Sequence, residues 1–192
     1  MKMKFKLLAL DMDGVVNSTQ LTRDWINAKY EMNKLDFPNL SELQLRDLTE
    51  QNFNEFFDYK TELIFPQLAK RITTICEKTN CYILWSSSWR LEPKYDDMEK
   101  TKEMFNRNNL PGDRLIGYTP NHEYFWGNSV RSDEIRNWLE NNIYGTVEKC
   151  AVIDDSSYAG LNLPDNAKFF KTDSEIGITD THVKNICKYL NS

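Results

Sequence analysis

Short apolar runs, each of which stops at polar residues, are spread along the chain. Runs of this length with such abrupt ends predict buried β-strands. We expect strands at residues 5–10, 81–85, 114–119, 150–153 and 167–171. Between these runs, apolar residues return every three or four positions, as on one face of an amphipathic helix. Helices are expected over residues 66–80, about 95–107, 133–143 and 179–190.

Strands that alternate with helices predict an α/β fold. We expect a Rossmann-like parallel sheet with helices on both faces, and the 192 residues suit a single domain. Residues 17–61 depart from this pattern because they are polar with scattered aromatic residues. We interpret them as a small, mainly helical cap insertion whose balance is slightly acidic, with five basic and eight acidic side chains.

Composition argues against several classes of protein. Hydrophobic residues make up 40% of the chain and aromatic residues 12%, which is enough for a core and argues against disorder. The net charge of −5 argues against broad, unspecific binding to nucleic acid or anionic membranes. No segment approaches the length of a membrane span, and the apolar run in "MKMKFKLLALD" is too short for a signal peptide. We therefore expect a cytoplasmic protein.

Cysteine and histidine give no sign of a soft metal site. The four cysteines form no C-x-x-C motif and lie in or beside apolar segments, so we expect small core residues that stay reduced. His122 and His182 make no metal-binding pair. A metal in this chain is therefore expected to have oxygen ligands.

Polar side chains follow three of the expected strands at the point where each strand ends. Asp11 and Asp13 follow the first strand, Ser86, Ser87 and Ser88 the second, and Asp154 and Asp155 the fourth. The carboxyl ends of parallel strands share one edge of the sheet, and ligands bind beyond that edge, so these groups can converge. Four carboxylates there would repel one another unless a cation lay among them, and their oxygen atoms favour Mg²⁺.

A phosphoryl group fits this set of side chains. A carboxylate can attack phosphorus and form an aspartyl-phosphate, and serine hydroxyl and backbone groups can hold phosphate oxygens. Arg131 stands just before the helix that leads into the Asp154 strand, so its guanidinium could reach the same edge. Lys102 and Arg90 are the alternative cations.

Together, these pieces resemble the haloacid dehalogenase (HAD) superfamily of phosphohydrolases. "LLALDMDGVVN" is similar to its first motif, "YILWSSSWR" to its second and "CAVIDDSS" to its fourth, and Arg131 takes the place of its third-motif cation. More narrowly, "WSSSWR", "RSDEIRNWL", "VIDD" and "KTDSEIGIT" resemble the HAD domain of Swiss Army Knife RNA repair proteins.

The resemblance implies a role for each acid. Asp11 is the nucleophile, and Asp13 is the general acid/base whose backbone carbonyl also binds Mg²⁺. Asp155 is the preferred direct metal ligand among the late acids, with Asp154 as the alternative. Arg131 stabilises the phosphoryl group.

The serine run is expected to bind the phosphate of the substrate. Ser87 aligns best with the family's phosphate-binding hydroxyl when Trp89 is used as the anchor, and Ser86 is the second choice. Ser88 is expected to orient the loop. Arg90, together with Trp89, is a candidate for clamping the substrate.

The implied activity is Mg²⁺-dependent hydrolysis of a phosphomonoester through an aspartyl-phosphate. The expected substrate is a small phosphorylated metabolite, a nucleotide or a nucleic-acid end, and the acidic cap argues against binding along an RNA strand. Two alternatives stay open: a non-catalytic HAD-like binding or regulatory module, and a phosphotransferase. A phosphorelay receiver domain is rejected because its acidic pair opens the domain, whereas here a second pair comes late.

Overall fold

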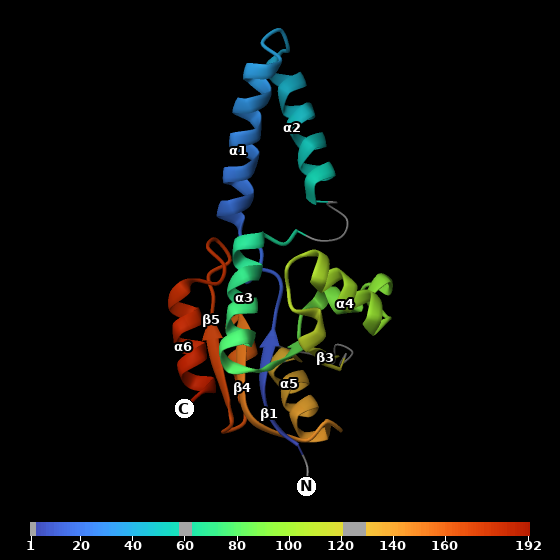
Figure 1. The fold of residues 1–192 in the computed structure, drawn as a ribbon. Helices are drawn as coiled ribbons and strands as arrows, with labels where there is room; N and C mark the ends of the chain where they lie inside the picture. The colour runs from blue at the N-terminus through green and yellow to red at the C-terminus, as the bar shows by residue number, and fades with distance from the viewer. Residues whose placement is uncertain (1–2, 58–62, 121–129) are drawn as a thin grey trace.

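The computed structural model describes residues 3–57, 63–120 and 130–192. Its centre is a five-stranded parallel sheet in the order β3-β2-β1-β4-β5 (Figure 1). The strands are β1 (Lys4–Leu10), β2 (Tyr82–Trp85), β3 (Leu115–Tyr118), β4 (Thr146–Asp154) and β5 (Ala167–Lys171). The expected α/β fold with a parallel sheet is confirmed. β4 begins earlier than its apolar run because Thr146 and Val147 pair with Lys4 and Phe5 of β1.

Six α-helices accompany the strands in the described ranges. They are α1 (Thr19–Asp36), α2 (Glu42–Phe57), α3 (Pro66–Thr79), α4 (Met98–Arg107), α5 (Val130–Asn141) and α6 (Asp180–Leu190). Thr179 caps α6: its hydroxyl accepts from the His182 N–H, and the His182 ring accepts from the Thr179 N–H. His182 therefore has a local structural role, whereas His122 lies outside the described residues.

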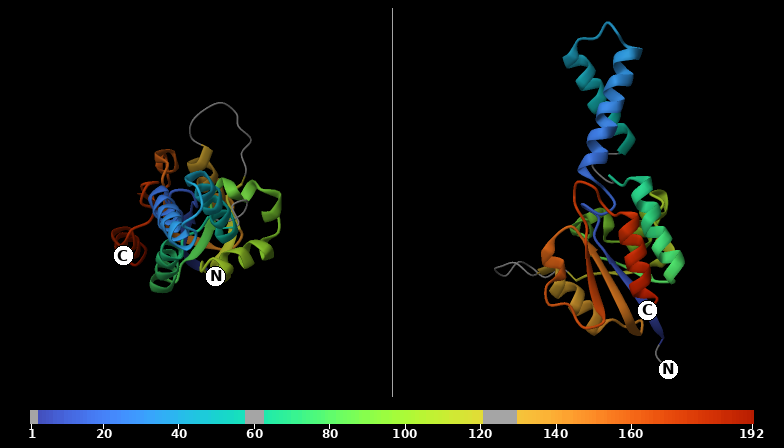
Figure 2. Two further views of the ribbon diagram at one scale, coloured as in Figure 1. Left: turned by 90° about the horizontal axis from the view of Figure 1, so that it is seen from above. Right: turned by 90° about the vertical axis from the view of Figure 1, so that its left-hand side faces the viewer.

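The helices cover both faces of the sheet (Figure 2). Leu8 and Leu10 of β1 pack with α3, α4 and α6 on one face, and Leu7 and Ala9 pack with α5 on the other. This division follows from the alternation of side chains along a strand. Among the described residues, no helix has both the length and the apolar character needed to span a membrane.

Two expectations for the helix at 133–143 were wrong. α5 begins at Val130, so Arg131 lies in its first turn instead of preceding it. α5 ends at Asn141, and Ile143 is 90% exposed instead of lying on the apolar face. The Asn142 side chain accepts from the N–H groups of Tyr144 and Gly145, which turns the chain away from the helix.

The insertion is helical over most of its described length. α1 and α2 lie antiparallel and form an arm, residues 19–57, that stands on the carboxyl edge of the sheet (Figure 1). Trp25 meets Phe53 edge-to-face across the arm, with ring centroids 5.4 Å apart. The root of α1 is fixed to the loop after β5, because the Ser18 hydroxyl and the Thr19 N–H donate to carbonyls of that loop.

Candidate active site

Three acids converge at the carboxyl edge of the sheet. Asp11 continues the pairing of β1, since its N–H donates to the Ile153 carbonyl at 3.1 Å. Asp154 is the last residue of β4, and Asp155 follows it. One carboxylate oxygen from each acid lies within 4.8 Å of the other two. This all-oxygen donor set fits a hard cation such as Mg²⁺.

Gly14 allows the first acidic loop to approach this cluster. Its φ is +64°, in the left-handed region that favours glycine. A Cβ atom at this position would lie 2.5 Å from Oδ2 of Asp155. A side chain on residue 14 would therefore occupy the space that the Asp155 carboxylate fills.

Asp13 is exposed and does not belong to the acidic cluster. Its Oδ1 accepts from Nδ2 of Asn17 and its Oδ2 from Nε1 of Trp89, both at 2.9 Å. Asn17 is held in turn by the Gly14 N–H, which donates to its Oδ1 at 2.7 Å. Asp13 thus connects the end of β1 with the root of the arm and with the serine loop, residues 86–90. Both partners of Asp13, the Asn17 amide and the Trp89 indole, were missed from the sequence. An asparagine just after a glycine turn is nevertheless a typical local acceptor, as Asn17 is for the Gly14 N–H.

Arg131 reaches the site from the first turn of α5. Its Nη1 donates to Oδ1 of Asp11 at 2.9 Å and to Oδ2 of Asp154 at 3.1 Å. The guanidinium therefore bridges the acids that end two neighbouring strands, β1 and β4.

The three serines have different environments. Ser86 extends the pairing of β2, because its N–H donates to the Leu10 carbonyl at 2.8 Å. Its side chain is buried, and its Oγ has no hydrogen-bond partner within the described part of the chain. Oγ of buried Ser87 accepts from the Trp89 N–H at 3.4 Å, whereas Ser88 is exposed.

Arg90 lies in a buried network. Its Nε donates to the Thr119 carbonyl at 2.9 Å and its Nη1 to the Ser87 carbonyl at 2.6 Å. Its Nη2 donates to the Pro120 carbonyl at 3.3 Å and to Oε2 of Glu134 at 2.6 Å. All three guanidinium nitrogens therefore donate to protein acceptors. Glu134 lies in the segment predicted to be a helix from residue 133, and nothing near it in the sequence indicates this partner.

A family model described as the HAD domain in Swiss Army Knife RNA repair proteins matches residues 7–183. The chain belongs to this family. No curated protein and no solved structure matched it. The acidic cluster of this HAD domain is consistent with the metal site of its superfamily.

Electrostatics in this HAD domain favour a cation at the cluster. Burial raises the pKa of Asp11. Burial, and then the Asp11 carboxylate, raise the pKa of Asp154 to about 7, and burial also raises the pKa of Asp155. The Arg131 guanidinium acts in the opposite direction on all three. A divalent cation among these carboxylates would favour their ionised forms further.

Proposed function

We propose that this HAD domain is a Mg²⁺-dependent phosphomonoester hydrolase that works through an aspartyl-phosphate on Asp11. The observation that carries the proposal is the environment of Asp11, a buried carboxylate at a strand end. It receives a guanidinium hydrogen bond at 2.9 Å and has the oxygens of two further acids within 4.8 Å. Such a site can accommodate both a cation and the anionic phosphoryl group that a nucleophilic carboxylate attacks.

We assign the metal ligands to the acidic cluster. The carboxylates of Asp11 and Asp155, with Asp154 as the alternative, would hold Mg²⁺ together with the backbone carbonyl of Asp13. When bound, the ion would supply positive charge to the phosphoryl oxygens. The fit rests on the donor set and on the space that Gly14 leaves beside Asp155.

Side chains of this chain would carry out the two steps of the hydrolysis. A carboxylate oxygen of Asp11 forms a bond to phosphorus while the bond from phosphorus to the ester oxygen breaks, and Asp13 protonates the departing oxygen. Asp13 then takes a proton from water, whose oxygen bonds to phosphorus as the bond to Asp11 breaks. Arg131 already donates to Asp11, so it is placed to donate to a phosphoryl oxygen attached there.

We assign the phosphate-binding hydroxyl to Ser86 instead of Ser87. Ser86 Oγ is a buried polar atom without a partner among the described residues, and such atoms usually have one. A phosphoryl oxygen would supply it. Ser87 Oγ instead accepts from the Trp89 N–H, so it helps to form the loop, as exposed Ser88 also would.

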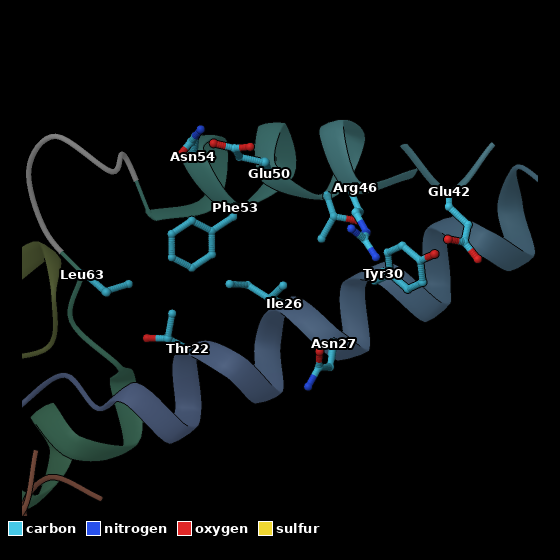
Figure 3. A pocket seen from close by; sticks show the side chains of 11 residues that line it. Thr22, Ile26, Asn27, Tyr30, Glu42, Arg46, Glu50, Phe53, Asn54 and Leu63 are labelled. Carbon is cyan, nitrogen blue, oxygen red and sulfur yellow. The ribbon is translucent and has the colours of Figure 1, made fainter. Parts of the chain in front are cut away.

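We propose that the arm is the cap of this site. A groove of about 950 Å³ runs along it between α1 and α2, and Ile26, Tyr30 and Phe53 provide its apolar surface (Figure 3). Polar side chains, Asn27, Arg46 and others, accompany them. This volume suits a small organic group.

The substrate class follows from the arm and from the family. An acidic arm favours a small phosphorylated metabolite, a nucleotide or a single nucleic-acid end over a long polyanion. The family's description names RNA repair, which supports a phosphorylated nucleic-acid end.

Phosphate release tests the proposal. The chain, with and without Mg²⁺, is incubated with p-nitrophenyl phosphate, nucleotides and RNA oligonucleotides phosphorylated at either end. Asp11→Asn should abolish release, whereas Asp113→Asn, a surface acid distant in sequence from the site motifs, should not. Binding without turnover would favour the non-catalytic module, and transfer to an added alcohol instead of water would favour a phosphotransferase.

A further inference from the structure

Arg90 and Glu134 form a buried ion pair beside the proposed active site. Nη2 of Arg90 lies 2.6 Å from Oε2 of Glu134, and the two side chains are 4% and 5% exposed. Charged side chains are seldom buried this deeply unless they are paired. Even when they are paired, buried charges contribute little net stability, because apolar residues of similar volume often stabilise the folded state as much or more. The pair therefore calls for a role besides folding.

The hydrogen bonds of the pair join three segments that lie far apart in the sequence. Arg90 donates to the Ser87 carbonyl in the serine loop and to the Thr119 and Pro120 carbonyls after β3. Glu134 also accepts from the Thr119 hydroxyl at 3.3 Å. It belongs to α5, one turn beyond Arg131.

The placement of the pair links the two groups that would hold the phosphoryl oxygens. The serine loop follows β2, and Arg131 projects from α5 onto Asp11 and Asp154. Only Arg90 and Glu134 connect the loop to that helix through an ion pair in the described part of the chain. A shift of either segment would separate the serine hydroxyl from the guanidinium.

We propose that Arg90 and Glu134 are positioning residues that fix the serine loop and the Arg131 helix relative to each other. The inference rests on the proposed function, since that function gives both segments a role at the phosphoryl group. Arg90 need not touch the substrate, because all three of its nitrogens already donate to the protein. A lysine could preserve the ion pair but not the full set of tethers, since its single ammonium lacks the planar fork of arginine.

Two variants separate positioning from folding. The double variant Arg90→Met/Glu134→Leu removes both charges together, so no unpaired charge is left buried. Arg90→Lys keeps the charge pair and loses carbonyl tethers. Circular dichroism and thermal unfolding measure the folded fraction of each variant. Hydrogen exchange measured by mass spectrometry on peptides from the serine loop and from α1 reports local order without any need for activity.

We expect both variants to be folded well below their melting temperatures. Amides of residues 86–89 should exchange at least tenfold faster, whereas those of α1 keep their wild-type rates. The kcat/KM for p-nitrophenyl phosphate with Mg²⁺, corrected for the folded fraction, should fall at least tenfold. Wild-type exchange in the loop and wild-type kcat/KM in folded variants would overturn the inference. If the wild-type chain releases no phosphate from any substrate, the proposed function fails, and loop exchange alone decides whether the pair positions the loop.

Discussion

Replacing Gly14 by alanine tests how the acidic loop and the metal site are built together. A left-handed backbone costs an L-residue about 1–2 kcal/mol, and φ at Gly14 is +64°. In addition, the new Cβ would lie 2.5 Å from Oδ2, 2.6 Å from Cγ and 2.7 Å from Cβ of Asp155. Real Cβ atoms essentially never approach this closely, so Asp155 must move. The substitution therefore combines backbone strain with displacement of a proposed metal ligand.

The two effects have different magnitudes and different readouts. The strain predicts a loss of about 1–2 kcal/mol in the free energy of unfolding, which lowers the melting temperature by about 2–8 °C in a chain of this size. Displacement of Asp155 predicts at least tenfold weaker Mg²⁺ binding, about 1.4 kcal/mol. Gly177→Ala is the matched control, because φ there is +75° and the atoms nearest to its added Cβ belong to Leu68, Val15 and Asn17, not to a carboxylate of the acidic cluster. It should lose stability and keep its affinity for Mg²⁺.

Thermal unfolding across a Mg²⁺ titration measures both quantities. Mg²⁺ should raise the melting temperature of the wild type in a concentration-dependent way, because it binds the native state. Gly14→Ala should need at least tenfold more Mg²⁺ for the same rise, whereas Gly177→Ala should start lower and respond normally. A wild-type response in Gly14→Ala, with a lost response in Asp155→Asn, would refute the crowding argument. A wild-type response in both would remove Asp155 from the ligand set.

Four further outcomes are expected. Asp11→Asn should reduce phosphate release by several orders of magnitude, while Asp13→Asn should be impaired and retain phosphate on Asp11, detectable by intact-mass spectrometry with an activated substrate. Arg131→Ala should lower kcat/KM at least tenfold, or about 1.4 kcal/mol in the barrier, and unchanged kinetics would assign the role to another cation. In the metal-free protein, the pKa of Asp154 is raised from 3.8 to about 7, so the native state binds this proton more tightly than the unfolded state. Melting temperature should therefore fall as pH rises through that interval, and Asp154→Asn should flatten the fall. In competition assays, a long phosphorylated RNA should not exceed a mononucleotide by orders of magnitude; a large advantage that collapses with salt would contradict the small-substrate proposal.

The parts of the site that the sequence predicts are those set by local pattern and sheet topology. Asp11, Ser86 and Asp154 each follow an apolar run, and parallel pairing places them on one edge. The alignment anchored on Trp89 favours Ser87 over Ser86, whereas the structure leads us to propose Ser86, because a run of identical residues gives little internal distinction in the sequence. The pairing of Ser86 with the Leu10 carbonyl and the burial of its unpartnered hydroxyl provide that distinction.

Features that depend on distant contacts or on local competition were not predictable. Arg90 and Glu134 lie 44 residues apart, and Glu134 in the sequence has the appearance of an ordinary acid near a helix start. Ile143 continues the helical spacing of α5, yet the Asn142 side chain bonds the next two N–H groups and the chain leaves the helix. In the first case, the spacing of apolar residues gives no information about the distant partner. In the second, a local turn ends the helix although the apolar spacing continues.

The two acids of the opening motif show how a single turn can assign different chemistry to neighbouring residues. Asp11 keeps the register of β1, so it is buried against Arg131, and a guanidinium stabilises the carboxylate that would attack phosphorus. Asp13 lies at the turn formed with Gly14, is exposed, and accepts hydrogen bonds from the neutral side chains of Asn17 and Trp89. These two donors orient the Asp13 carboxylate at the turn, so the different surroundings of the two acids match the different roles that we propose for them.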